Sequence, residues 1–420
     1  MDYRDFIAAG QRCGGLTVFL TLMATILGAS ATLGVAAKAE TIGFPAAWWL
    51  FSGAVGLALQ GVALSARIRA SGACTLPELA GLKAGPSARR LVAVVIGLSW
   101  PAVIAAQLIA FAGLWNAFAG TEQRLFPITV CAGAVVLYTL AGGQRAVVRT
   151  DGPQMAILTV GFGGLFFWAF SGRCGGTPLP SGTIRLFSPD FTAWDAALSL
   201  LTVGGAYFLG PDIASRSLVA RDGPTARRAV LAAAPALVVF GAAIALAGIW
   251  AGANVPGAGN PILRIAVRLP IAVRICLEAG LFCAILSSVD TCLMNAAAIV
   301  AGDLFEARSV RASRMAVAVI GGIAAVLAAF GGDIIGVLLK AYSVYTPGVV
   351  CPLAVAIIAG QVNHRLWLAA VALGGLCGLA GTLVPGGEIL PAVGMGVSLL
   401  LALAATVYGK GRVRDGSTAT

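Results

Sequence analysis

Apolar positions dominate almost the whole chain, in runs too long for the interior of a soluble domain. From Leu16 onward, segments of about 20 mostly apolar residues, the length that crosses a bilayer as a helix, alternate with short polar connections. The pattern predicts twelve transmembrane helices, over residues 16–37, 44–66, 91–118, 126–142, 151–170, 194–213, 228–252, 271–301, 313–331, 333–359, 365–384 and 388–408.

Two of these spans are interrupted near their middle by small residues. The first is interrupted within residues 24–31, and the sixth within residues 204–211, which end in a Gly-Pro pair. A broken helix frees backbone groups that lipid cannot satisfy, so we expect both breaks to line a cavity inside the protein. The alternative is that the glycines only permit close helix packing.

The two interrupted spans stand five helices apart, as expected for the first helices of two inverted five-helix repeats. This interpretation predicts an all-α membrane fold divided into a cytoplasmic N-terminus at 1–15, a first repeat at 16–170, an outer loop at 171–193, a second inverted repeat at 194–360, two accessory helices at 361–408 and a cytoplasmic tail at 409–420.

Composition and charge support a membrane protein. Hydrophobic residues make up 59% of the chain and charged residues 11%, which excludes soluble packing. The net charge of +11 does not indicate nucleic-acid binding, because most Lys and Arg fall in alternate connections and in both tails. That bias places both termini in the cytoplasm and counts Arg216 among the cytoplasmic residues. We expect a multi-pass protein of the plasma membrane, or the inner membrane of a bacterium, surrounded by lipid.

The eighth span carries oxygen donors at the spacing of one helix face. Ala284, Ser287 and Ser288 stand at positions i, i+3 and i+4. Neutral oxygens hold sodium weakly enough to release it in every cycle. If the first break adds the carbonyls of Ala24 and Leu27, a sodium site of five oxygens results. The alternative is that the serines bond to their own helix.

Two carboxylates lie inside or beside apolar spans, where ionisable groups indicate function or a buried partner. Asp290 follows Ser288 and is a candidate for coupling or gating. Asp151 opens the fifth predicted span, where it either takes part in coupling or caps the helix.

Candidates for contact with a solute are polar, aromatic or small residues at the breaks and in two other spans. They are Gly28, Ser30, Gln107, Tyr207, Gly210 and Tyr342, with Trp100 and Tyr345 as further aromatic candidates. Membrane aromatics more often belong to interfacial belts or cores. The sequence offers no nucleophile with a base, no phosphate loop and no metal-ligand cluster other than the sodium oxygens, so we do not expect an enzyme.

Six short motifs occur in the order known from one transporter family. They are residues 6–12, 75–79, 105–107, the stretch from Gly142 through Thr150-Asp151 to Gln154, Tyr207-Phe208-Leu209-Gly210-Pro211 with Arg216, and residues 287–291 with Asp303 downstream. Over most of its length the chain thereby resembles the sodium/solute symporter family, nearest its proline and pantothenate transporter branch.

The resemblance implies a LeuT-type five-plus-five fold, alternating access, and sodium held between the first and eighth helices by Ala24, Leu27, Ala284, Ser287 and Ser288. Sodium and a small organic solute, such as an amino acid or carboxylate, would then move together. The alternatives are a proton-coupled transporter, with Asp151 or Asp290 titrating, and a membrane solute sensor that does not transport.

The chain also departs from the family pattern. It begins at the motif that follows the family's extra first helix, and Leu209 and Gly210 replace more typical residues. Asp212 stands where a histidine is common, so the motifs predict coupling to sodium better than they predict the solute.

Overall fold

The computed structural model describes residues 3–179 and 181–415, with only the backbone described at 410–415. Within this part of the chain the regular elements are helices, and no strand is present, so the prediction of an all-α fold is confirmed. Positions 1, 2 and 416–420 of the two predicted tails lie outside the described residues.

The first part of the chain contains eight α-helices. They are α1 (Tyr3–Ala8), α2 (Gly15–Ile26), α3 (Val35–Ile42), α4 (Trp48–Leu59), α5 (Ser65–Ala70), α6 (Leu76–Ala84), α7 (Pro86–Ala119) and α8 (Leu125–Phe170). Single wider π-turns occur at η2 (Ser30–Gly34), which leads directly into α3, and at η4 (Gln60–Leu64), which joins α4 to α5 in one continuous helix.

The remainder of the chain is built in the same way. Its helices are α9 (Ala193–Ser199), α10 (Gly205–Leu209), α11 (Pro211–Leu218), α12 (Gly223–Asn254), α13 (Pro261–Ala266), α14 (Ile271–Ile299), α15 (Val310–Phe330), α16 (Ile334–Tyr345), α17 (Cys351–Ala359), α18 (His364–Leu383) and α19 (Leu390–Asp415). Three π-turns, η5 (Leu200–Gly204), η6 (Val300–Leu304) and η7 (Thr346–Val350), connect neighbouring helices.

Short polar side chains begin several of these helices. The side chain of Thr75 accepts a hydrogen bond from the backbone of Glu78 at the start of α6, and Asp222, Ser309, Asp333 and Asn363 do the same for α12, α15, α16 and α18. Each cap satisfies an amide that would otherwise lack a partner. Local sequence therefore fixes where these helices begin.

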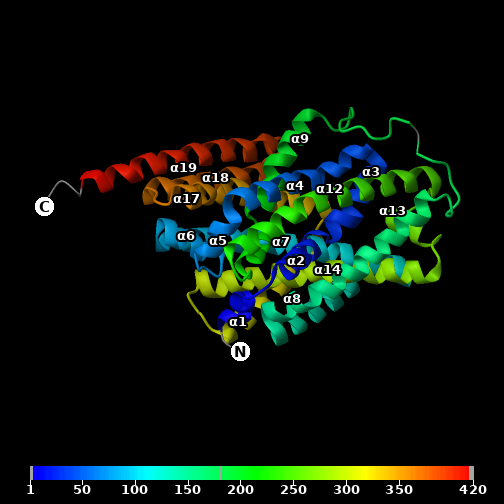
Figure 1. The fold of residues 1–420 in the computed structure, drawn as a ribbon, viewed down its shortest axis with the longest axis horizontal. Coiled ribbons are helices and arrows are strands. Elements are labelled where there is room, and N and C mark those ends of the chain that lie inside the picture. Colours follow the sequence, from blue (N-terminus) through cyan, green and yellow to red (C-terminus); the bar gives the residue numbers. More distant parts are fainter. Residues whose placement is uncertain (1–2, 180, 416–420) are drawn as a thin grey trace.

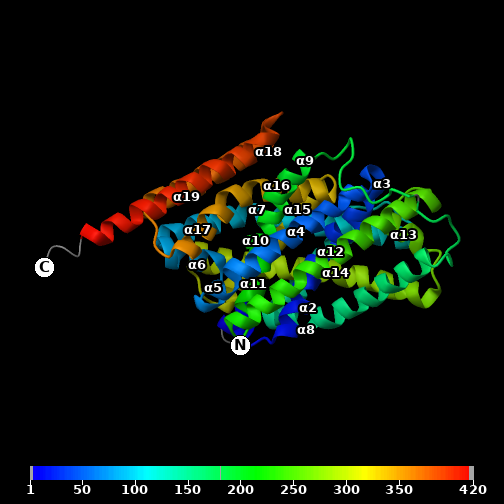
Figure 2. The same ribbon diagram turned by 45° about the horizontal axis from the view of Figure 1, so that its top comes forward.

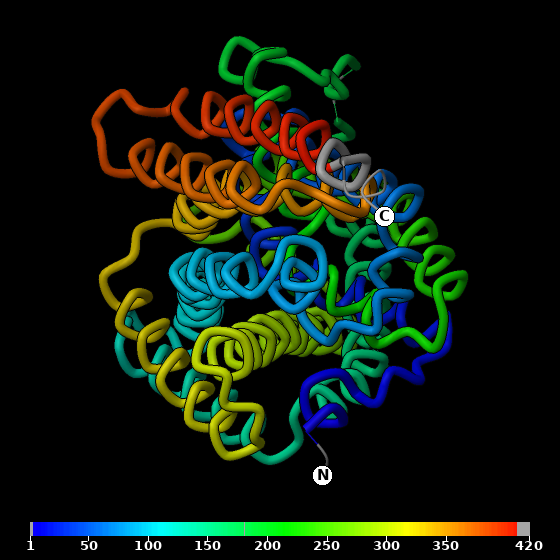
Figure 3. The backbone as a smooth tube through the Cα atoms, turned by 90° about the vertical axis from the view of Figure 1, so that its left-hand side faces the viewer, coloured from blue at the N-terminus to red at the C-terminus, as the bar shows by residue number. Residues whose placement is uncertain are grey.

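The long helices run side by side along one direction, and α18 and α19 pack together along one edge (Figures 1 and 2). Viewed along that direction, the helices appear end-on around a crowded centre (Figure 3). α14 packs against α2, α7, α8 and α15, which makes it a central helix of the bundle.

The number of candidate spans differs from the prediction of twelve. Within the described residues, ten helices, together with the bent pair α2 and α3, are long and apolar enough to cross a membrane. The difference arises at α8, whose 46 residues contain both predicted spans 126–142 and 151–170. The backbone leaves helical geometry at Gly143, with φ 57° and ψ −160°. A side chain there would collide with Phe6, since an added Cβ would lie 2.6 Å from its ring.

Both predicted helix breaks are present. α2 ends at Ile26, and the chain bends by 57° before it continues as η2 and α3. α10 and α11 are separated by Gly210, whose backbone is extended with φ −68° and ψ 147°. α11 packs against both α2 and α14, so the two breaks lie close together within the bundle.

Candidate solute and cation site

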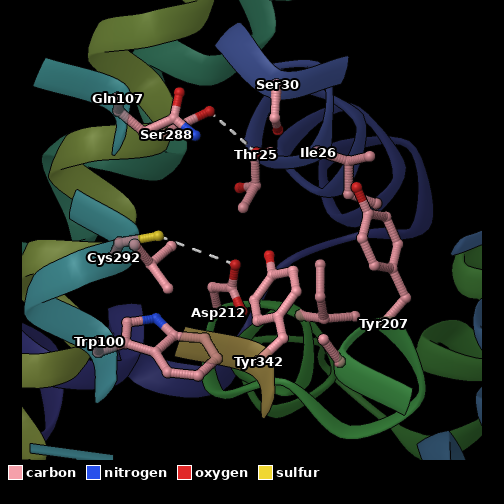
Figure 4. Close-up of a pocket in the computed structure, with 13 residues that line it drawn as sticks. Thr25, Ile26, Ser30, Trp100, Gln107, Tyr207, Asp212, Ser288, Cys292 and Tyr342 are labelled. Atoms are coloured by element: carbon pink, nitrogen blue, oxygen red, sulfur yellow. Dashed lines mark hydrogen bonds between the residues drawn. The ribbon is translucent and has the colours of Figure 1, made fainter. Parts of the chain in front are cut away.

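A small polar pocket lies between the two helix breaks and α7, α14 and α16 (Figure 4). Its cavity volume is about 20 Å³, which is room for little more than one water molecule. Four predicted solute contacts line it, namely Ser30, Gln107, Tyr207 and Tyr342. The structure therefore brings together residues that are more than 300 positions apart in the sequence.

Gln107 holds the break in the first span open. Its side-chain oxygen Oε1 accepts a hydrogen bond from the backbone N–H of Ala29 at 3.0 Å. In an unbroken helix that N–H would donate to the carbonyl of Thr25. Instead the Thr25 carbonyl accepts a hydrogen bond from the Ser288 hydroxyl at 2.9 Å, so the break joins the first span to α14.

Gly28 permits the close approach of these two helices. An added Cβ at this position would lie only 2.3 Å from Oγ of Ser288 and 3.0 Å from Oε1 of Gln107. The glycine is therefore required by packing at the break, where the sequence analysis placed it as a solute contact. Gly210 acts through the backbone in a similar way, because it forms the extended link between α10 and α11.

The predicted sodium oxygens meet only in part. Ser288 Oγ lies 3.0 Å from the Ala284 carbonyl as well as 2.9 Å from that of Thr25. Leu27 is buried at the bend, and Ala24 is buried one turn earlier in α2. Ser287 points elsewhere, since its hydroxyl donates to Oδ1 of Asp151 at 2.6 Å.

Arg216 and Asp151 form a fully buried ion pair beside these oxygens. Nη2 of Arg216 lies 3.4 Å from Oδ2 of Asp151, and both side chains have no exposed surface. The guanidinium also donates to the Thr25 hydroxyl, at 2.8 and 3.1 Å, and to the Thr291 hydroxyl. The hydroxyl of Thr21 donates to the same carboxylate.

This arrangement corrects two interpretations made from the sequence. Arg216 does not lie in a cytoplasmic connection, because α11 returns it into the bundle one turn after the helix break. Asp151 does not cap a helix, because the helix continues from before it and the carboxylate faces α2, α11 and α14. Hydropathy could not reveal either partner, since they are separated by 65 positions in the chain.

Asp290 adds a second carboxylate to the same buried cluster. It is 2% exposed, its Oδ1 accepts a hydrogen bond from Thr291, and it interacts electrostatically with Asp151 and Arg216. Two carboxylates against one guanidinium leave one formal negative charge uncompensated. Such a charge in a dry interior favours either a bound proton or a nearby cation.

Three residues that the sequence analysis did not assign to the site contribute to it. Asp212 and Cys292 line the pocket, and the Cys292 thiol donates to Oδ2 of Asp212 at an S···O distance of 3.8 Å. Thr25 contributes its carbonyl and its hydroxyl. The position of Asp212 directly after the Gly-Pro break was the one signal available in the sequence.

Aromatic rings form one side of the pocket. The centroids of Trp100 and Tyr345 are 4.8 Å apart in an edge-to-face arrangement, and Trp100 and Tyr342 are 6.4 Å apart. Tyr345 does not line the pocket; its hydroxyl donates to the Leu209 carbonyl and so supports the second helix break. Trp100 and Tyr342 remain as aromatic walls for a solute.

A larger cavity lies on the side of the predicted outer loop. It offers about 690 Å³ and is lined by α3, α4, α9, α16, α19 and parts of the loops before α9 and α19. Its charged lining residues are Lys38, Asp190, Asp195, Lys340 and Glu388. Trp49 lines this cavity and stacks at 6.4 Å on Tyr342 of the central pocket, so one aromatic layer stands between the two.

Three solved structures have similar folds. A Na⁺-coupled sialic acid symporter, in a substrate-bound outward-open state with a novel Na⁺ site, matches with a TM-score of 0.73 and 16% identity, covering 96% of this chain and 92% of that chain. Mhp1, a nucleobase-cation-symport-1 family transporter in a closed conformation with bromovinylhydantoin bound, matches with a TM-score of 0.66 and 13% identity. The match covers 97% of this chain and 95% of that chain. MhsT in complex with L-phenylalanine matches with a TM-score of 0.59 and 18% identity, and the match covers 93% of this chain and 98% of that chain.

These likenesses confirm the predicted LeuT-type fold. No curated protein matches the chain in sequence. The profile of the Sodium:solute symporter family matches residues 6–374, which is most of the chain. The prediction of a transporter rather than an enzyme is thereby confirmed. From its sequence, its fold and the site between its two broken helices, the chain belongs to the sodium:solute symporter family.

Proposed function

We propose that the chain imports a small organic solute, such as an amino acid, a carboxylate or a related metabolite, together with sodium by alternating access. The observation that carries the proposal is the hydrogen bond from Ser288 in α14 to the Thr25 carbonyl at the helix break, beside a polar pocket. Sodium bound there would stabilise the bent first span against α14 and thereby favour solute binding next to it.

In this proposal Ala24, Leu27, Ala284, Ser287 and Ser288 supply oxygens to sodium. The Ser288 hydroxyl donates its hydrogen toward the two carbonyls, which leaves its lone pairs free to face the ion. Family membership and the Na⁺-coupled neighbour support sodium as the coupling ion. The motif set favours the branch that contains proline and pantothenate transporters.

The proposed setting is the plasma membrane, or the inner membrane of a bacterium, with both termini in the cytoplasm. The excess of Lys and Arg in alternate connections supports this orientation even without Arg216. The two five-helix repeats would run over residues 16–170 and 194–360, each opening with an interrupted helix. α18 and α19 would then be accessory helices outside the repeats.

The test is uptake of radiolabelled proline, pantothenate and short carboxylates into proteoliposomes under an imposed sodium gradient. We expect Ser288→Ala to raise the sodium concentration for half-maximal uptake by about tenfold, the effect of losing one ligand of ordinary strength. Ser398→Ala is the matched control, because Ser398 is equally buried but lies in α19. Unchanged sodium dependence in the Ser288 variant would remove this residue from the site.

A proton-coupled transporter is the second candidate, favoured by the uncompensated charge of the cluster of Asp151, Asp290 and Arg216. Uptake that follows a pH gradient and ignores a sodium gradient would identify it. Accumulation of solute in either gradient also separates a transporter from a sensor that binds without transport.

A further inference from the structure

Asp212 is the one charged residue among the described residues that line the central pocket. The other lining side chains are neutral polar, aromatic or aliphatic, and none is Lys or Arg. Figure 4 shows the Asp212 carboxylate at the middle of the pocket, with Ser30 and Gln107 on one side and Tyr342 and Trp100 on the other. The lining of the pocket therefore contains one carboxylate and no cationic side chain.

The carboxylate forms no direct ion pair, and Arg216 acts on it only electrostatically from farther away. Its Oδ2 accepts a weak hydrogen bond from the Cys292 thiol at 3.8 Å, and backbone N–H groups at the start of α11 donate to it. Among the described residues, no Lys or Arg nitrogen lies within 4.0 Å of it. Arg216, one turn further along α11, uses its guanidinium on Asp151, Thr25 and Thr291.

A structural role at the start of a helix explains why an acidic residue follows Pro211. It does not explain why the Asp212 side chain points into the pocket. A carboxylate in the first turn of a helix complements the helix dipole, and α11 begins at Pro211. A carboxylate that contacts only other protein groups would interact with the helix dipole equally well. Here the side chain instead reaches a cavity, between the rings of Trp100, Tyr207 and Tyr342, whose faces attract cations.

We infer that the transported solute carries a protonated amino group that pairs with Asp212, so that the pocket accepts cationic or zwitterionic compounds and rejects purely anionic ones. The inference rests on the proposed function and narrows its solute class. The Ser30 hydroxyl and the Gln107 amide, which are neutral, would face the carboxylate of a zwitterionic solute. At about 20 Å³ the pocket is smaller than such a solute, so binding requires its lining side chains to move apart.

The test uses probes that match in shape and differ in charge. One set is pyrrolidine, proline and cyclopentanecarboxylate, and the other is isobutylamine, valine and 3-methylbutanoate. The measurement is the thermal unfolding midpoint of the purified full chain with each probe, in sodium and in potassium buffer. We expect stabilisation by an amine-bearing member of at least one set, and none by the carboxylates that lack the amine. Stabilisation by those carboxylates, or by no amine, overturns the inference.

The variant Asp212→Asn keeps the shape of the side chain and removes its charge. We expect it to weaken amine binding roughly ten- to a hundredfold, the effect of losing one charge-assisted hydrogen bond. Asp190→Asn, in the larger outer cavity, is the control and should retain wild-type binding. Retained amine affinity in Asp212→Asn overturns the inference. If this variant does not fold, the probe series on the wild type decides alone.

Failure of this inference can be distinguished from failure of the proposed function. Sodium-driven uptake, and stabilisation of the wild type by sodium without solute, test the proposed function and need no charge on the solute. If both are present while anionic probes bind best, only the solute class is wrong. If both are absent while amines still bind in potassium, the solute class holds and sodium coupling is wrong.

Discussion

The two ends of the bundle are closed by different means. At the end predicted to face the cytoplasm, Asp303 of η6 accepts hydrogen bonds from Thr75 and from Arg89, both at 2.7 Å, and Glu78 pairs with Arg308 at 3.3 Å. We call these five residues the inner latch. At the other end a large cavity extends inward as far as the aromatic layer of Trp49 and Tyr342.

The difference indicates which of the two barriers, the inner latch or the aromatic layer, opens more easily in this conformation. Charged hydrogen bonds between half-buried groups have strict geometry, and breaking one leaves a charge without its partner. Stacked rings resist separation mainly through apolar contact and can slide past one another at lower cost. The structure therefore resembles a state prepared to open at the large cavity, with the end that carries the inner latch fastened. The predictions below test this contrast, from the largest expected effect to the smallest.

The largest expected effect concerns the buried ion pair of Arg216 and Asp151. Replacing Arg216 by Ala leaves Asp151 and Asp290 buried without their cation, and we expect a loss of about 3–5 kcal/mol in the free energy of unfolding. Denaturant unfolding in detergent measures it. Arg221→Ala is the control, because that arginine pairs with Asp222 in an exposed position. Equal stability of the two variants would contradict a structural role for the buried pair.

The inner latch is the next target. Asp303→Ala removes the shared acceptor of Thr75 and Arg89, and we expect a loss of about 2–3 kcal/mol, since one bond is to a charged donor and the acceptor is buried. The end that carries the inner latch should also open more often, measured as faster labelling of a cysteine placed at Ala84. Glu306→Gln provides the comparison, because its pair with Arg90 is exposed at the same end. Labelling equally slow in both variants would show that the latch does not hold this side closed.

The outer aromatic layer should matter less for stability and more for access. Trp49→Leu removes the stack on Tyr342, and because such pairs contribute about 0.5–1.5 kcal/mol, labelling of Cys292 from outside should accelerate roughly two- to tenfold. The measurement requires a variant in which Cys292 is the only one of the nine cysteines retained. Trp48→Leu, whose ring packs on Phe187 outside the layer, is the control. No acceleration would show that the barrier lies elsewhere.

The smallest expected effect concerns Tyr3, which lies beside the inner latch. Burial, with the neighbouring Asp303 carboxylate, raises the pKa of Tyr3 to about 12 from its ordinary value of 10.0. Because the neutral phenol is the form favoured by folding, its contribution is complete below pH 10.0 and is lost as the pH rises toward 12. Thermal unfolding of Tyr3→Phe should therefore lose less stability than the wild type over that interval. Parallel pH curves would contradict this assignment.

Hydropathy and small-residue patterns predicted much of the fold because lipid imposes strong rules on any chain that crosses it. The breaks at residues 27–29 and at Gly210, and the face that carries Ala284 and Ser288, needed only local patterns. The separation of the fourth and fifth spans was less certain. Gly143 changes the backbone direction while the helix continues on either side, and apolar composition does not record such a kink.

Charged residues were interpreted less well, because a charge looks the same in sequence whether water or a buried partner satisfies it. Arg216 was counted with the cytoplasmic cations, and Asp151 was considered as a helix cap. The burial of each residue is instead explained by the ion pair that it forms with the other. That pair forms because α11 turns back into the bundle. Asp212 attracted notice only as a departure from a family pattern.

The sequence by itself determined that this chain crosses a membrane many times, that two of its helices are broken, and that Ser288 shares a helix face with Ala284. These features follow from hydrophobic length, from the backbone freedom of glycine and from helical spacing, all of which are local. Only the tertiary structure decided which charges are paired and which one faces the pocket. That outcome depends on contacts between distant helices, where burial makes the choice of partner energetically decisive.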